Sequence, residues 1–263
     1  AAQQRAARWW RSDLDDFEEL SHGHGGTVKV ALAGPWTLAA AVRLGHPTMN
    51  HVITDPGACR DVWQALAEAA TELAARLTGR LNRPVILQVD EPMIGAALGG
   101  ELATFSGLDR YRTPDTDEVL TGWRELVHSV QQVPGVEQVW LHSCAPGVDI
   151  DLAGRAGFGG LALPAEFVCD APMIDQCHGW LDAGRTLALG VARTDQADLA
   201  TVDQLVTQAM KALRPLEPTA PQLTDQFVLT PDCGLAGWPM RSAGLLLERL
   251  AEAARLVAER AAT

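Results

Sequence analysis

Short apolar runs rich in β-branched residues alternate along the chain with longer segments of helical periodicity. The short runs predict β-strands at Thr27–Ala33, Val85–Val89, Val139–His142, Gly160–Leu163, Thr186–Val191 and Phe227–Thr230. The longer segments predict helices at Gln3–Leu20, Asp61–Leu81, Asp117–Val130, Val202–Leu213 and Arg241–Arg260. Strands that alternate with helices form parallel sheets with right-handed crossovers. The pattern therefore predicts either a doubly wound α/β sheet or a (β/α)8 barrel.

The residues that follow the predicted strands favour the barrel. Four strands run directly into polar or chemically active segments: Gly34–Thr37, Asp90–Pro92, His142–Cys144 and Pro231–Gly234. A barrel gathers such strand ends into one site at its C-terminal face. The doubly wound alternative lacks a dinucleotide fingerprint, because the glycine-rich segment 157–160 precedes a strand rather than a helix. We therefore expect an α/β fold of the TIM-barrel type.

The number of predicted strands is smaller than a complete barrel requires. Six strands are predicted where a (β/α)8 barrel has eight, and the chain opens with the helical segment Gln3–Leu20. Either the fold is not a barrel, or its first two strands belong to sequence outside this chain. We expect the second case, in which residues 1–263 form a single, N-terminally incomplete barrel domain with an open sheet edge.

Composition excludes several classes of function. The 263 residues include 21 Lys and Arg against 33 Asp and Glu, a formal net charge of −12, so we expect no nucleic-acid partner. No apolar run reaches the roughly 18 residues of a membrane-spanning helix, so we expect no association with a membrane. Residues 1–25 lack the features of a secretory signal. The five cysteines are an odd number scattered along the chain, which favours reduced thiols in a cytoplasmic protein.

The segment His142-Ser143-Cys144 is the strongest candidate for chemistry. Residues i and i+2 of a strand point the same way, so His142 and Cys144 can offer an imidazole and a thiolate to one point. Cys233 follows a later strand of the same predicted sheet. One nitrogen and two sulfurs favour zinc. The His-x-Cys pair alone is weak evidence for a metal site, because such pairs also occur by chance in strands. With the second cysteine, a metal site and a chance pair both remain open as interpretations.

Two further segments stand at predicted strand ends. A carboxylate after a buried strand is costly unless it is paired, so Asp90 should meet a ligand or an internal cation, or else cap the segment that follows. In the segment Gly34–Thr37, Pro35 suits a first helical turn and Thr37 a helix cap. Cys59 and Cys177 fall in helical segments, where we expect them to be structural.

Four motifs, each after a predicted strand, together resemble a known family. They are GPWTLA at Gly34–Ala39, QVDEP at Gln88–Pro92, HSC at His142–Cys144 and TPDCGL at Thr230–Leu235. The chain resembles the catalytic, C-terminal barrel of cobalamin-independent methionine synthase, over about residues 28 to 250. More closely, it is similar to short single-barrel bacterial proteins of the uroporphyrinogen decarboxylase/methionine synthase superfamily.

The resemblance implies a zinc enzyme. In this family a His, a Cys, a Glu and a second Cys bind zinc, and three of these ligands fall on His142, Cys144 and Cys233. The aspartate of the family's DEP motif, which holds the amino group of homocysteine, falls on Asp90. We expect Asp90 to act in catalysis by orienting the substrate, and we place Glu91 of the same motif with it in the substrate-binding site.

The chain departs from the family's pattern in three places. Matching strand to strand puts Pro164 at the position of the Glu ligand, whereas counting residues from Cys144 suggests Glu166, which is otherwise a solvated loop carboxylate. The family also has an acidic residue beyond DEP, where this chain has only Ile94–Ala97. An Ile-Gly-Ser motif and a further Glu that contact homocysteine have no counterpart here.

The resemblance implies zinc-dependent methyl transfer to the thiol of homocysteine, forming methionine. The expected partners are a homocysteine-like thiol and a methyl donor, either a methyl-folate or a methyl-corrinoid protein. Two alternatives stay open. The zinc could activate another thiol, such as coenzyme M, or the chain could be a metal-binding barrel without catalysis.

Overall fold

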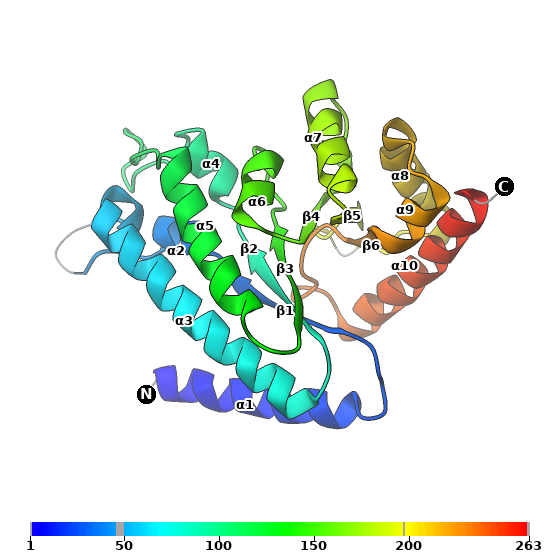
Figure 1. Cartoon of the computed structure of the whole chain (residues 1–263), viewed down its shortest axis with the longest axis horizontal. Coiled ribbons are helices and arrows are strands. Elements are labelled where there is room, and N and C mark those ends of the chain that lie inside the picture. The colour runs from blue at the N-terminus through cyan, green and yellow to red at the C-terminus, as the bar shows by residue number, and fades with distance from the viewer. Residues whose placement is uncertain (1, 46–49, 197, 262–263) are drawn as a thin grey trace.

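Six parallel strands form one sheet in the computed structural model, which describes residues 2–45, 50–196 and 198–261 (Figure 1). The strands are β1 (Val28–Ala33), β2 (Val85–Asp90), β3 (Val136–His142), β4 (Gly160–Pro164), β5 (Thr186–Ala192) and β6 (Phe227–Pro231). They follow one another in the order β1-β2-β3-β4-β5-β6, and every neighbouring pair is parallel. All six strands predicted from the sequence are confirmed, with ends that differ by a few residues.

Helices connect the strands and cover the outer face of the sheet. They are α1 (Ala2–Leu20), α2 (Pro35–Ala41), α3 (Pro56–Leu81), α4 (Ile94–Leu98), α5 (Thr116–Gln131), α6 (Ile150–Ala156), α7 (Ala171–Asp182), α8 (Val202–Leu213), α9 (Ala220–Asp225) and α10 (Met240–Ala261). Along this face, α3 packs beside α5 against β2 and β3, and α8 packs beside α10 against β5 and β6 (Figure 1). The five long helices predicted from the sequence are confirmed. Within the described part of the chain, no helix combines the length and apolar character needed to cross a membrane.

The strand order decides between the two folds that the sequence left open. A doubly wound sheet reverses its strand order at a switch point, whereas this sheet adds each strand beside the previous one, as a barrel does. The His142 ring at the end of β3 also contacts the Asp232 carbonyl just after β6, although β4 and β5 lie between them in the sheet. The sheet is therefore curled into part of a barrel. Among the described residues it has six strands, and β1 and β6 form its two edges.

The core lies between the outer face of the sheet and the helices. Outward-facing residues such as Leu87, Val89 and Leu141 are fully buried there. Two aromatic pairs fill the space beneath α2, α3 and α5: Trp36 with Trp63, with ring centroids 5.8 Å apart, and Trp123 with Phe158, at 5.6 Å. The inner face is less apolar. There Ile86, Trp140, Ala162 and Ala188 form only a small cluster, and the polar side chains of Lys29, Gln88, Asp90 and His142 lie beside it.

The carboxylate of Glu91 connects three elements around the ends of β1 and β2. It accepts hydrogen bonds from the backbone N–H of Trp36 at 3.0 Å and of Thr37 at 2.7 Å, from the Thr37 hydroxyl at 2.7 Å, and from the Trp123 indole at 3.1 Å. Glu91 thus satisfies the first free N–H groups of α2, where a negative charge is also favoured by the helix dipole. The expectation that Thr37 caps this helix is wrong. Gly34 is the N-cap and makes no side-chain cap bond, while Thr37 donates its hydroxyl to Glu91.

We predict that Gly34→Ala destabilises the fold by about 1–3 kcal/mol, the usual range for overpacking. A Cβ at position 34 would lie 2.3 Å from Cδ of Glu91, and this side chain cannot move away without losing its hydrogen bonds. Urea unfolding measures the change in the free energy of unfolding. Gly25→Ala is the matched control, because its added Cβ meets no atom within 4 Å. Equal stability of the two variants would contradict the argument.

Candidate functional site

Three potential metal ligands converge where β3 and β6 end. His142 is the last residue of β3, Cys144 follows it by two positions, and Cys233 lies two residues beyond the end of β6. Their ligand atoms all lie within 4.8 Å of one another. His142 is buried, Cys144 is half-buried and Cys233 is exposed, so the cluster is held on one side and open on the other. The structure thus brings together the three side chains that the sequence singled out.

Asp90 lies beside this cluster because of the strand register. The ladder between β2 and β3 pairs Asp90 with His142, and Asp90 Oδ1 lies 3.0 Å from His142 Nδ1. The same oxygen accepts a hydrogen bond of 2.8 Å from the Gln88 amide. Within the described residues, no hydrogen bond reaches Asp90 Oδ2, and the side chain is 35% exposed. The alternative that Asp90 caps the following segment is not seen, since α4 has no side-chain cap.

The ring of His142 faces an acceptor at each nitrogen. Nδ1 faces the Asp90 carboxylate, and Nε2 lies 3.1 Å from the carbonyl oxygen of Asp232. A histidine that donates one ring N–H to a carboxylate has its orientation and tautomer set by that bond, which leaves the other nitrogen to bind a metal. His142 therefore has the environment of a metal ligand with an acidic partner behind it.

The chemistry of the two thiols also suits a metal. Burial, together with the neighbouring Cys233, raises the pKa of Cys144 to about 11. At neutral pH and without a cation, this side chain is therefore a thiol rather than a thiolate. A soft divalent cation binds the thiolate and displaces the proton. One imidazole and two thiolates form a donor set that fits zinc, with room for a further ligand.

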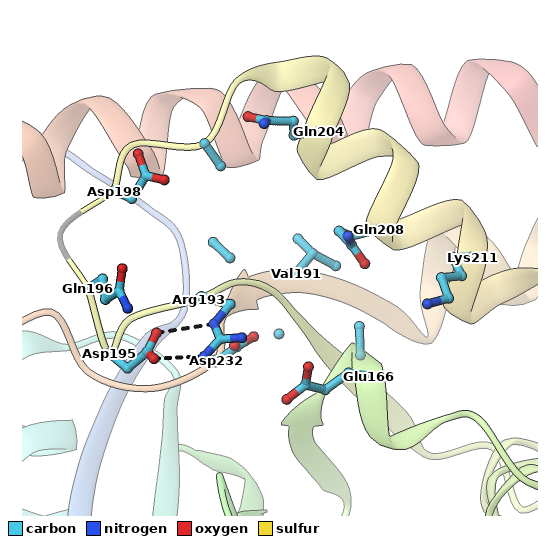
Figure 2. A pocket seen from close by; sticks show the side chains of 14 residues that line it. Glu166, Val191, Arg193, Asp195, Gln196, Asp198, Gln204, Gln208, Lys211 and Asp232 are labelled. Carbon is cyan, nitrogen blue, oxygen red and sulfur yellow. Dashed lines mark hydrogen bonds and ion pairs between the residues drawn. The ribbon is translucent and has the colours of Figure 1, made fainter.

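Glu166 is not a member of the cluster and instead lines a cavity (Figure 2), whose lining also includes Asp232, the residue before Cys233. Glu166 follows β4 in a short 3-10 turn, Ala165–Phe167, and the cavity has a volume of about 600 Å³. Burial raises the pKa of Asp232 to about 7, and the charge of Glu166 contributes to the increase. On the same wall Arg193 forms an ion pair of 2.7 Å with Asp195. The role of Glu166 as the fourth metal ligand stays a prediction.

Glu91, like Glu166, is a predicted site residue that the structure does not bring into the cluster. Its side chain is fully buried, and both carboxylate oxygens accept protein hydrogen bonds. Burial raises the pKa of Glu91, while the hydrogen bonds from Thr37, Trp123 and Trp36 oppose this effect. Direct contact with a substrate, which we expected from the motif, would require these bonds to break.

Cys59 and Cys177 behave as expected for structural residues, whereas Cys169 is exposed. Cys59 is buried in the first turn of α3, and Cys177 is buried in α7, where desolvation raises its pKa to about 12. Two polar residues of the inner face, Lys29 and Gln88, escaped the sequence reasoning, although they lie next to Asp90. The signal for Lys29 was a single lysine within an apolar strand. Gln88 belongs to the QVDEP motif, but the sequence pattern assigned it no role of its own.

Comparisons with known proteins add an independent line of evidence. The family model described as "Cobalamin-independent synthase, Catalytic domain" matches residues 5–256. Among solved structures, the chain is similar to a B12-independent methionine synthase from Shewanella sp. W3-18-1 in complex with selenomethionine, with 16% identity and a TM-score of 0.59. That match covers 89% of this chain but only 63% of the synthase, so the chain spans less than two thirds of that protein.

A second structure gives a weaker match. It is described as a lyase/mutase from Burkholderia cenocepacia J2315, with 12% identity, a TM-score of 0.30, and coverage of 81% of this chain and 80% of that one. The low TM-score means that this likeness supports no argument. No curated protein matched the chain in a sequence search.

We predict that the protein purified without chelators carries about one zinc ion per chain. Cys144→Ser and Cys233→Ser should each lower the zinc affinity by at least about tenfold, because each removes a soft ligand from the cluster. Elemental analysis and competition with a chromophoric chelator measure the content and the affinity. Cys169→Ser, at an exposed cysteine outside the cluster, is the control and should retain zinc.

The zinc affinity should also depend on pH in a defined direction. Because the pKa of Cys144 is raised to about 11, protons compete with the metal for this thiol, and affinity should increase as pH rises from about 6 to about 8. A protein that binds zinc equally well after both serine substitutions, or whose affinity falls with rising pH, would rule out this cluster as the metal site.

Proposed function

The chain belongs to the cobalamin-independent synthase catalytic-domain family, and from that premise we propose that it is a methyltransferase that transfers a methyl group to the thiol of homocysteine, forming methionine. The observation that carries this proposal is the convergence of His142, Cys144 and Cys233, with Asp90 directly behind the histidine. A soft-metal cluster beside a free carboxylate oxygen suits a substrate that has both a thiol and an amine.

We propose zinc as the resident metal, because the donor set of one imidazole and two thiolates fits it. When bound, zinc would lower the pKa of the substrate thiol, so that the thiolate exists at neutral pH as a nucleophile. His142 would bind through Nε2, in place of its contact with the Asp232 carbonyl, while Nδ1–H stays bonded to Asp90. Glu166, which lines a cavity together with Asp232, is the proposed fourth protein ligand.

Asp90 would hold the amino group of homocysteine. Its Oδ1 is engaged by Gln88 and His142, so Oδ2 is the oxygen that can accept from the substrate ammonium. A charge-assisted hydrogen bond of this kind is stronger than a neutral one and favours an amino-bearing thiol over a thiol without an amine. Holding the amine fixes the substrate at one end, which orients the sulfur for the transfer.

We propose that the donor is a methyl-folate or a methyl-corrinoid protein, and the two are separable only by assay. The alternative acceptor, coenzyme M, has no amino group for Asp90 to bind. A reducing compartment such as the cytoplasm fits the site, because both cysteine ligands must stay reduced and all five cysteines are free.

We predict that Asp90→Asn, assayed with zinc in excess, weakens the use of homocysteine by roughly 10- to 100-fold. The asparagine oxygen can still accept the hydrogen bond from His142, so the protein stays loaded with zinc under these conditions. The asparagine is close in size to the aspartate but lacks the charge that attracts the ammonium group. The assay measures methyl transfer from methyl-folate and from methylcobalamin, with homocysteine and with mercaptobutyrate, the analogue that lacks the amino group. The substitution should raise KM for homocysteine and leave KM for mercaptobutyrate nearly unchanged.

Asp61→Asn, on the exposed surface of α3, is the control and should behave as the wild type does. Equal losses for both thiols would reject the role of Asp90. Zinc binding without any methyl transfer, from either donor and to any thiol, would instead support the alternative of a metal-binding barrel without catalysis.

A further inference from the structure

Lys29 is a cation on the inner face of the curled sheet. Its neighbours in β1, Val28 and Val30, face the helices, so the alternation of the strand turns Lys29 toward the interior. Its ammonium lies 5.6 Å from the centre of the Trp140 ring, within the range of a cation–π interaction. Burial lowers the pKa of Lys29, and the nearby Asp90 carboxylate raises it in opposition. The side chain of Lys29 is nevertheless exposed to solvent at this open face, and its nearest protein partners are polar.

These partners form a chain of hydrogen bonds that leads to the candidate metal site. Lys29 Nζ donates to Gln88 Oε1. Gln88 Nε2 donates to Asp90 Oδ1 at 2.8 Å, and the same oxygen lies 3.0 Å from His142 Nδ1. The residues come from three neighbouring strands, β1, β2 and β3. Gln88 is the central member and is buried, with 7% of its surface exposed.

The chemistry of the two ends determines the direction of the Gln88 amide. A lysine ammonium can only donate hydrogen bonds, and an ionised carboxylate can only accept them. The amide must therefore point its oxygen at Lys29 and its nitrogen at Asp90. Without Lys29, the Oε1 atom of the buried Gln88 amide would lose the donor that holds it. The amide could then turn this oxygen toward the Asp90 carboxylate, where two acceptors repel each other.

We propose that Lys29 is a positioning residue for Asp90, the carboxylate that binds the amine of the substrate in the proposed function. By holding the Gln88 amide in one orientation, it keeps Asp90 Oδ1 occupied and leaves Oδ2 directed to the amino group of the substrate. The inference rests on the proposed function, in which Asp90 binds the amine of homocysteine. Lys29 itself touches neither the substrate nor the metal ligands; it acts through Gln88.

The test measures selectivity by calorimetry on the zinc-loaded protein. The readout is the ratio of affinities for homocysteine and for mercaptobutyrate, which isolates recognition of the amine from binding of the thiol. We expect Lys29→Met to lower this ratio about tenfold, because one charge-assisted contact of the amine is lost or misaligned. Lys29→Arg retains a donor toward Gln88 and should keep most of the selectivity.

A double-mutant cycle separates this role from a general structural one. Gln88→Leu should lower the ratio as Lys29→Met does, and the double variant should lose no more than either single variant, because the two residues act as one relay. Arg8→Met, which removes a cation from the exposed surface of α1, is the control for loss of charge. Urea unfolding of each variant confirms that the compared proteins are folded.

Each outcome has a distinct meaning. An unchanged ratio in Lys29→Met, while Asp90→Asn loses selectivity, would overturn the inference and leave the proposed function standing. Additive losses in the double variant would also overturn it, since independent effects exclude a relay. A wild-type protein that shows no preference for homocysteine would overturn the proposed function, and the inference with it.

Discussion

The register of the parallel ladder between β2 and β3 sets Asp90 opposite His142, and the rest of the site depends on this pairing. A slip of one residue between these strands would place the side chains of Asp90 and His142 on opposite faces of the sheet, because successive residues of a strand alternate between faces. With the register as it is, Cys144 follows His142 at the mouth of the curled sheet. The curl then brings Cys233 from the end of β6 to the same point. The cluster is thus a consequence of sheet geometry, which brings Cys233 to His142 and Cys144 although it is far from them in the sequence.

The ends of these strands are held in place by a buried carboxylate. Glu91 follows Asp90 directly, and its side chain binds the first turn of α2 and the Trp123 indole of α5. Its backbone N–H also donates to the carbonyl of His142 at 2.8 Å. One residue therefore links β2, β3, α2 and α5 around the position of Asp90. A buried charge is costly unless its hydrogen bonds are complete, and here four donors satisfy it.

Much of the fold and part of the site could be predicted from the sequence, for reasons that differ between residues. The strands were predictable because their apolar, β-branched runs are bounded by turns. His142 and Cys144 were predictable because residues i and i+2 of an extended segment point the same way, and the two side chains stay close although β3 ends at His142. The role of Glu91 was not, because a helix capped by a side chain from another strand leaves no local signal, and the nearby Thr37 offered a local answer that was wrong. Lys29 was missed for the same reason: its partners lie on neighbouring strands.

In the proposed function, zinc held by the two thiolates and the imidazole would bind the sulfur of the substrate. X-ray absorption spectroscopy of the zinc-loaded protein with selenohomocysteine tests this most directly, since selenium and sulfur scatter differently. We expect a zinc shell with two protein sulfurs and at least one nitrogen, to which selenium is added when the substrate analogue binds. A zinc shell of nitrogen and oxygen alone, or one that selenium never enters, would contradict the proposed function.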